Sequence, residues 1–203
     1  MKYPIIKIKY NRFLDPIFKG WILSQEKYKN WTPPDMVKIN SQVLMYKEEW
    51  GKYGEKIIES MCRVTNLEFE RNIIDIYIVS GNPRPFSRPL VLSCGYNNIK
   101  FINYITHELI HCLFSDNDIK EGFSKKVRYT HDSEIVSRHV LVYAILNYIL
   151  IDVLEKPNYL ENVIKNDAHF PKLGYHEAWN IIEKIGYKKI IELYKEGVLD
   201  KVE

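Results

Sequence analysis

Hydrophobic and polar residues alternate with a period of two in two stretches of the N-terminal half. Residues 3–10 and 72–80 are rich in isoleucine and tyrosine and alternate in this way, which is typical of strands. A short apolar run, 90–93, predicts a third strand. Because Pro89 just before it has no backbone N–H, we expect this strand at an edge of the sheet. The segment 81–89 holds three prolines and predicts a loop.

A helical period governs most of the remaining chain. Apolar residues at steps of three and four predict helices over about 35–64, from about 99, over 131–154, near 159–166, and over 175–195 with a break at Gly186. Gly51 and Gly54 are positions at which the first of these helices can bend. The polar segment 115–130 predicts a loop. Strands and a long helix thus come first and helices follow, which indicates the α+β class.

The helix that begins near residue 99 carries two different faces. Its apolar residues fall at helical steps and form one stripe: Ile102, Ile105, Leu109 and Leu113. His107 and His111 are four residues apart, so they project together from another face of the same helix. The helix can therefore pack on a core and still direct both histidines into a cleft.

The two histidines belong to the sequence "THELIH", which has the pattern H-E-x-x-H. Two imidazoles at this spacing can reach one zinc ion at about 2.0–2.1 Å. Glu108 lies beside His107 and is not needed as a ligand. It can take a proton from a water that attacks a carbonyl and then pass this proton to the leaving amine. The pattern predicts a metal-dependent hydrolase.

A catalytic zinc ion needs a third protein ligand, and the next predicted helix offers two candidates. His139 opens an otherwise apolar stretch, so we expect it to be buried and in need of a partner, which zinc would supply. Glu134 is the alternative, although Arg138, one turn away, can pair with it instead. The two side chains point about 140° apart on one helix, so they are not equivalent ligands. We favour His139.

"HELIH", preceded by "PLVLS" and followed by a helical half, resembles the zincin metallopeptidases, and within them the compact gluzincin-like group. The resemblance implies that His107 and His111 are zinc ligands, that Glu108 is the general base and acid, and that a later helix supplies the third ligand. Glu134 follows His111 at a separation typical of gluzincins. The gluzincin E-x-x-x-D pattern is absent, however, because position 138 is Arg138.

The resemblance also sets the expected architecture. We expect one zincin-like domain over 1–203, with a small mixed sheet, a long helix and the active-site helix in 1–114. An all-helical part, 115–203, would carry the third ligand. Groups able to stabilise a transition-state oxyanion are Tyr129, His131, Tyr143 and His176, and the sequence does not choose among them.

Composition excludes several classes of protein. Of the 203 residues 46% are hydrophobic and 27% are charged, as in folded globular proteins. The net charge of +3 is spread without a basic stripe, so no nucleic-acid partner is predicted. The apolar stretch 139–154 is shorter than the roughly 20 residues that span a bilayer, so no membrane association is predicted. Three cysteines without a C-x-x-C pair favour a reducing compartment and a cytoplasmic protein.

The sequence therefore predicts a zinc metallopeptidase that binds one Zn²⁺ per chain and acts on a peptide or protein substrate. The alternative is a catalytically inactive zincin-like domain that keeps its zinc and works as a binding or regulatory module. A minor third hypothesis is a hydrolase of a non-peptide amide.

Overall fold

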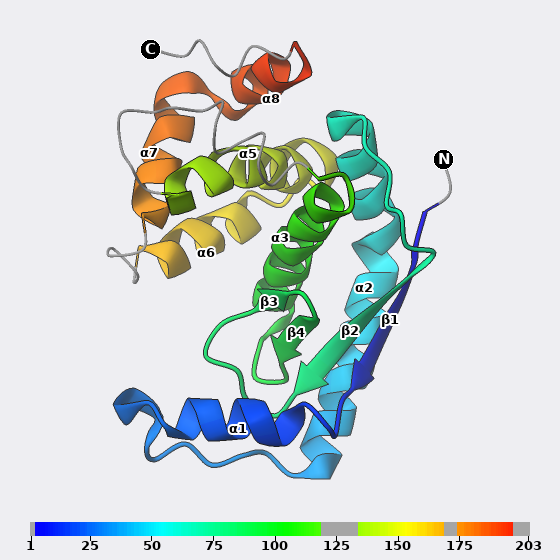
Figure 1. The fold of residues 1–203 in the computed structure, drawn as a ribbon, viewed down its shortest axis with the longest axis vertical. Coiled ribbons are helices and arrows are strands. Elements are labelled where there is room, and N and C mark those ends of the chain that lie inside the picture. Colours follow the sequence, from blue (N-terminus) through cyan, green and yellow to red (C-terminus); the bar gives the residue numbers. More distant parts are fainter. Residues whose placement is uncertain (1–2, 119–133, 169–173, 197–203) are drawn as a thin grey trace.

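The computed structural model describes residues 3–118, 134–168 and 174–196 (Figure 1). Its strands are β1 (Ile5–Tyr10), β2 (Ile73–Val79), β3 (Phe86–Ser87) and β4 (Leu90–Ser93). Its helices in the first half are α1 (Asp15–Leu23), the short 3₁₀ helix η1 (Glu26–Tyr28), α2 (Met36–Thr65) and α3 (Asn98–Asp116). Those in the second half are α5 (Glu134–Tyr148), the π-helical η2 (Ile149–Val153), α6 (Pro157–Asp167), α7 (Tyr175–Ile185) and α8 (Tyr187–Lys195).

The four strands form one mixed sheet in the order β1-β2-β4-β3. β1, β2 and β4 are parallel, and β3 is antiparallel to β4. The prediction of an edge position for residues 90–93 is wrong, because β4 lies between β2 and β3 with all four residues buried. Phe86 and Ser87, which were expected in a loop, form the edge strand instead. Pro89 lies one residue before β4, so its missing N–H does not interrupt the ladder.

One face of the sheet packs against helices, and the other face is partly exposed along β1 and β2. Ile8 and Ile76 are paired across β1 and β2, and both are buried on the covered face, against which α2 packs. On the opposite face Lys9 and Asp75 form an ion pair of 2.8 Å. Alternation along β1 and β2 thus separates core from surface, as the period of two predicted.

The long helix α2 confirms the helix predicted over about 35–64. The Asp35 side chain caps it by accepting a hydrogen bond of 2.8 Å from the Lys38 backbone N–H. The helix runs without interruption through Gly51 and Gly54. Gly54 allows a close approach of the Trp50 ring, since a Cβ at this position would clash with Trp50 Cε2.

α3 confirms the helix predicted from about residue 99, and it lies between the sheet and the C-terminal helices (Figure 1). The Asn97 side chain caps it by accepting from the Lys100 backbone N–H. Every residue of the predicted apolar stripe is fully buried: Ile102, Ile105, Leu109 and Leu113. The Phe101 ring stacks on Tyr46 of α2 with centroids 4.1 Å apart, which fixes α3 against α2.

The described residues after Asp116 form helices only, as predicted. α5 lies at the centre of this part and packs against α3, α7 and α8. Gly186, with a φ of +88°, separates α7 from α8 at the predicted break. Residues 119–133, which include most of the predicted loop and the start of the predicted helix over 131–154, lie outside the described residues. The fold is thus a helix-rich mixed α/β architecture with a small mixed sheet.

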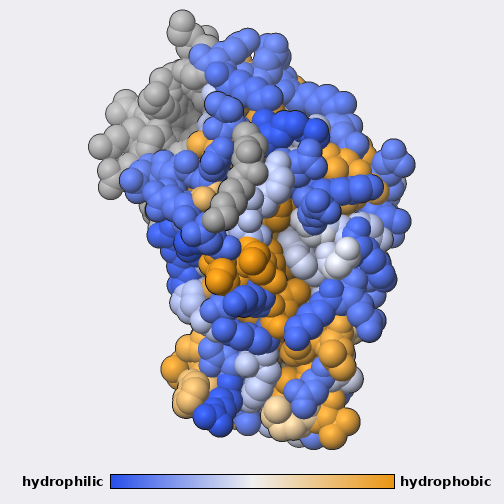
Figure 2. All heavy atoms as spheres, turned by 90° about the vertical axis from the view of Figure 1, so that its right-hand side faces the viewer, coloured by the Kyte–Doolittle hydropathy of each residue, from blue (hydrophilic) through white to orange (hydrophobic). Residues whose placement is uncertain are grey.

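The surface at the right of Figure 1 is mainly polar, with several separate groups of hydrophobic residues between the polar ones (Figure 2). Of the helices that the structure describes, none combines the length and the apolar character that crossing a bilayer requires. All three cysteines, Cys62, Cys94 and Cys112, are buried and free, which confirms that they do not form a disulfide framework.

Candidate metal centre

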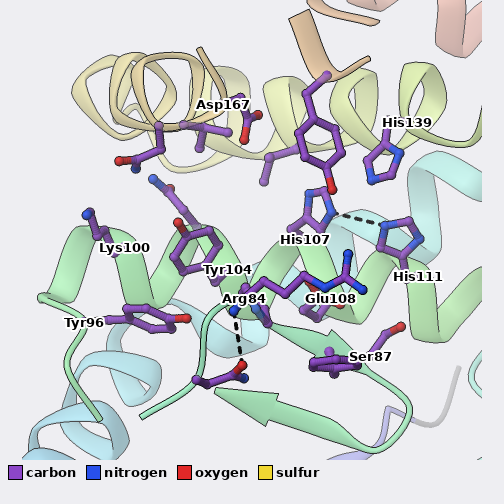
Figure 3. Close-up of a pocket in the computed structure, with 18 of the residues that line it drawn as sticks. Arg84, Ser87, Tyr96, Lys100, Tyr104, His107, Glu108, His111, His139 and Asp167 are labelled. Atoms are coloured by element: carbon purple, nitrogen blue, oxygen red, sulfur yellow. Dashed lines mark hydrogen bonds between the residues drawn. The ribbon is translucent and has the colours of Figure 1, made fainter. Parts of the chain in front are cut away.

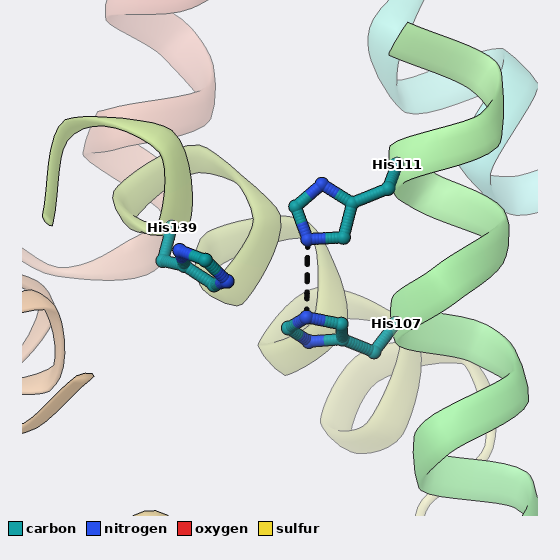
Figure 4. Close-up of side chains that lie close together, drawn as sticks. All are labelled: His107, His111 and His139. Atoms are coloured by element: carbon teal, nitrogen blue, oxygen red, sulfur yellow. Dashed lines mark hydrogen bonds between the residues drawn. The ribbon is translucent and has the colours of Figure 1, made fainter. Parts of the chain in front are cut away.

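His107 and His111 lie one turn apart on α3, and both project toward α5 (Figure 4). Their Nε2 atoms are 3.1 Å apart, and their ring centroids are 4.8 Å apart. Because the apolar stripe packs α3 into the core, both imidazoles remain partly exposed. The structure thus gives the histidine pair the placement that the helical spacing predicted.

His139 of α5 faces this pair (Figure 4). Its ring centroid lies 5.4 Å from that of His107 and 5.2 Å from that of His111. One ligating nitrogen from each of the three residues lies within 4.8 Å of the other two. The structure therefore brings together the favoured third candidate and the two histidines of the motif. Glu134 belongs to the first turn of α5, but its side chain lies outside the described residues.

The three imidazoles fit a metal ion. Nitrogens bound tetrahedrally at about 2.0–2.1 Å would lie about 3.3–3.4 Å apart, so small side-chain rotations would complete the site. The pKa of His107 is well below its usual value, first because the protein around the cleft shields the ring from solvent and then because His111 and His139 are close. The neutral imidazole offers the lone pair that a metal requires. Imidazole ligands suit zinc, copper, iron and nickel, so the donor set alone does not identify the metal.

Glu108 lies beside the histidines and lines the same cleft. Glu108 is only 8% exposed, and burial raises the pKa of its carboxyl to about 8. The positive charge of Arg84 acts in the opposite direction and lowers this pKa. A carboxyl group with a pKa in this range can both accept and donate a proton near neutral pH.

Tyr143 of α5 and Trp179 of α7 form an aromatic wall next to the histidines. The Tyr143 ring lies 5.5 Å from His107 and 5.4 Å from His139, measured between centroids. Trp179 stacks on Tyr143, with centroids 4.3 Å apart and an angle of 13° between planes. Trp179 Nε1 donates to Asp167 Oδ2 over 2.9 Å, and Tyr143 also hydrogen-bonds this carboxyl. Asp167 thereby fixes both aromatic residues next to the histidines.

Tyr175, the first residue of α7, was not predicted as part of the site. Its ring centroid lies 4.9 Å from that of His139, and the residue lines the cleft. Of the groups considered for oxyanion stabilisation, Tyr143 lines the cleft. His176 is exposed and is hydrogen-bonded to Asn180 at 3.2 Å. Tyr129 and His131 lie outside the described residues. No sequence pattern distinguishes Tyr175, because only the packing of α7 on α5 brings it to the histidines.

The cleft has a volume of about 760 Å³ and extends from the histidines along α3 (Figure 3). Lys100, Tyr104 and Glu108 succeed one another at steps of four and form a row along this helix. The segment that precedes β3 contributes Arg84 to the lining, and α6 contributes Asp167. Two separate parts of the chain thus face α3 across the cleft.

The C-terminal end of α3 is held in place by ion pairs of a buried aspartate with two partly exposed arginines. The Asp116 carboxylate, with 4% of its side chain exposed, pairs with Arg71 at 2.9 Å and with Arg88 at 3.2 Å. These arginines precede β2 and β4, so the ion pairs tie the helix that carries the histidines to the sheet. Leaving Asp116 unpaired in this position would be costly, which favours a fixed orientation of α3.

No family model, no curated protein and no solved structure matches the chain. The relation to zincins therefore stays a prediction that rests on the H-E-x-x-H motif. What the structure itself contributes is a group of three histidines that can hold a metal ion, next to a buried glutamate in a cleft.

Proposed function

We propose that the chain is a zinc-dependent peptidase. The observation that carries this proposal is the convergence of His107, His111 and His139 within 4.8 Å, beside Glu108 and in an accessible cleft. Three protein ligands with room for a further one are typical of catalytic zinc sites, whereas structural sites have four protein ligands. Of the described residues, only these three form such a group.

Each residue has a distinct role in this proposal. The three imidazoles bind the ion, and the lowered pKa of His107 favours the neutral form that binding requires. When bound, zinc supplies Lewis acidity that polarises the substrate carbonyl and activates water. Tyr143 packs against two of the ligand rings and limits their movement, as the outer partners of metal ligands commonly do.

Glu108 moves the proton. Its carboxylate accepts a proton from the attacking water and then donates it to the amine nitrogen of the broken peptide bond. Burial favours the protonated form of this carboxyl, which assists the second transfer. The positive charges of Arg84 and of an ion held by the histidines favour the ionised form, which the first transfer requires.

The dimensions of the cleft support a peptide substrate. Its volume of about 760 Å³ is at the upper part of the range for sites that bind small ligands, roughly 300–1,000 Å³. The row from Glu108 to Lys100 spans eight residues of α3, or about 12 Å at 1.5 Å per residue. An extended peptide of about three or four residues covers this length.

The proposal is tested with zinc-loaded wild-type protein and two matched variants, Glu108→Gln and Glu183→Gln. Glu183 is an exposed glutamate of α7. We expect the wild type and Glu183→Gln to bind about one zinc per chain and to hydrolyse members of a mixed peptide library, detected by mass spectrometry. Glu108→Gln should bind the same amount of zinc and lose hydrolysis. A wild-type protein that is fully loaded with zinc and cleaves no peptide would contradict the proposal and leave a zinc-binding module.

A further inference from the structure

We propose that the cleft binds carboxylate groups of its ligand at two separate positions, Arg84 and Lys100, and therefore selects acidic peptide segments. This inference rests on the proposed function for the step of hydrolysis, but not for binding. The carboxylate can come from an aspartate or glutamate side chain or from the C-terminus of a peptide, and both sources present the same chemistry to the two cations.

Lys100 lies at the far end of the cleft from the histidines (Figure 3). It is two turns before Glu108 on α3, and Tyr104 stands between them. The Tyr104 ring contacts that of Tyr96, with centroids 4.7 Å apart, so an aromatic surface separates the two polar ends. A peptide whose scissile bond lies at Glu108 would reach Lys100 with a group about three or four residues away.

Arg84 occupies the end of the cleft near Glu108. Its backbone is held by the buried Asn82, whose Oδ1 accepts from the Arg84 N–H at 3.1 Å and whose Nδ2 donates to the Val91 carbonyl at 3.2 Å. The Arg84 side chain extends across the cleft in front of Glu108 (Figure 3). A guanidinium group offers a planar pair of donors that matches a carboxylate.

Neither cation forms an ion pair with a carboxylate of the described residues. Other cations of this part of the chain do: Arg71 and Arg88 pair with Asp116, and Lys188 pairs with Asp152. The Arg84 guanidinium lies over the Phe86 ring at 5.5 Å, an arrangement that leaves its N–H edge open to a carboxylate. Both cations line the cleft, where a bound ligand would meet them.

Neither acidic group described in the cleft forms an ion pair with these two cations. The described residues of the lining include two carboxyl groups, Glu108 and Asp167. Asp167 already accepts hydrogen bonds from Trp179 and Tyr143. Glu108 lies at the metal centre, and the proposed reaction uses it. The lining thus presents positive charge at both ends, which favours a ligand of opposite charge.

Binding is measured with the zinc-loaded Glu108→Gln protein, so that no peptide is consumed. The probes are fluorescein-labelled, alanine-based octapeptides in which one Glu is moved through every position, each matched by a Gln peptide. Every peptide is made with a free and with an amidated C-terminus. Fluorescence anisotropy gives the affinities. We expect at least one Glu position, or the free C-terminus, to strengthen binding about tenfold over its neutral counterpart, or about 1.4 kcal/mol.

Further substitutions in the Glu108→Gln protein show which residues cause the preference for acidic peptides. Lys100→Ala and Arg84→Ala should each reduce the preference for the acidic peptide, and Lys100→Glu should favour Lys-containing peptides instead. Lys47→Ala, which removes an exposed lysine of α2 outside the cleft, should leave the preference unchanged. Lys100→Gln removes the charge but keeps most of the aliphatic stem, and it replaces Lys100→Ala in this test if that variant is unstable.

The outcomes separate this inference from the proposed function. Equal binding of acidic and neutral peptides, a preference that survives both Lys100→Ala and Arg84→Ala, or no binding of any peptide would overturn the proposed carboxylate subsites. An acidic preference that depends on these residues supports it, even if the wild-type protein hydrolyses none of the peptides. In that case only the proposed peptidase activity fails.

Discussion

The His139 ring of α5 lies nearly parallel to the His107 ring of α3, with 28° between their planes and 5.4 Å between their centroids. The two residues are 32 positions apart in the sequence and belong to helices that pack against each other. A metal ion bound by both would therefore link α3 to α5 and stabilise the folded chain, because the unfolded chain does not hold the three imidazoles together.

Zinc binding should raise the thermal stability of the protein through His139. At a free zinc concentration 100 times the dissociation constant, we expect an added stability of about 2.7 kcal/mol. The measurement is thermal unfolding of chelator-treated protein with and without added zinc. His139→Ala should remove this shift, whereas His176→Ala, which changes an exposed histidine outside the cleft, should retain it. An equal shift in the two variants would show that His139 is not a ligand.

Glu134→Gln distinguishes the two candidates for the third ligand. Since His139 already completes a group of three ligating side chains, we expect Glu134→Gln to bind one zinc per chain with nearly unchanged affinity. Zinc content after dialysis and competition with a chromophoric chelator measure this. A loss of more than about 100-fold in affinity, greater than that usual for residues behind the ligands, would identify Glu134 as the ligand instead.

The stack of Trp179 on Tyr143, next to the histidines, should contribute to the free energy of unfolding of the protein. Trp179→Ala removes a buried ring and should lower the free energy of unfolding by about 3–5 kcal/mol in urea titrations. Trp179→Phe keeps a stacked ring but loses the hydrogen bond to Asp167, and should cost about 1–3 kcal/mol. Equal losses in the two variants would show that the aromatic contact adds nothing beyond the hydrogen bond.

Asp167 should make stability depend on pH. Burial raises the pKa of this carboxyl in the folded protein, although the hydrogen bonds from Trp179 and Tyr143 oppose the shift. The folded state therefore binds the proton more tightly than the unfolded state. The contribution of Asp167 to stability is then greatest in acid and falls as the pH rises through its usual pKa to its raised one.

Asp167→Asn removes this titration and keeps an acceptor for both donors. Urea unfolding at several pH values between about 4 and 7 should show the stability of Asp167→Asn improving relative to wild type as the pH rises. A difference between the two proteins that is constant with pH would contradict a raised pKa at Asp167.

The sequence predicted the centre of the site because local periodicity determines it. The stripe from Ile102 to Leu113 had to face the core, and this placed His107 and His111 on the remaining face. His139 could be singled out because a histidine in a strongly apolar helix needs a partner, and the structure supplies His107 and His111 as its neighbours.

Other features depend on tertiary packing and left no local pattern. The edge position of β3 follows from the pairing of Phe86 with Val91, which two residues cannot signal in a sequence. α1 was not predicted: it follows a turn in which the Asn11 side chain accepts from the backbone N–H of Phe13 and Leu14. The approach of Tyr175 to His139 depends on how α7 returns over α5, and no period in the sequence encodes that contact.

The most direct test of the account is a crystal structure of the zinc-loaded protein, with the metal located by anomalous scattering at the zinc edge. We predict one zinc ion bound by His107, His111 and His139 at about 2.0–2.1 Å, with its fourth position taken by a water near Glu108. Zinc bound elsewhere, or a fourth protein ligand that closes the site, would contradict a catalytic metal centre at these residues.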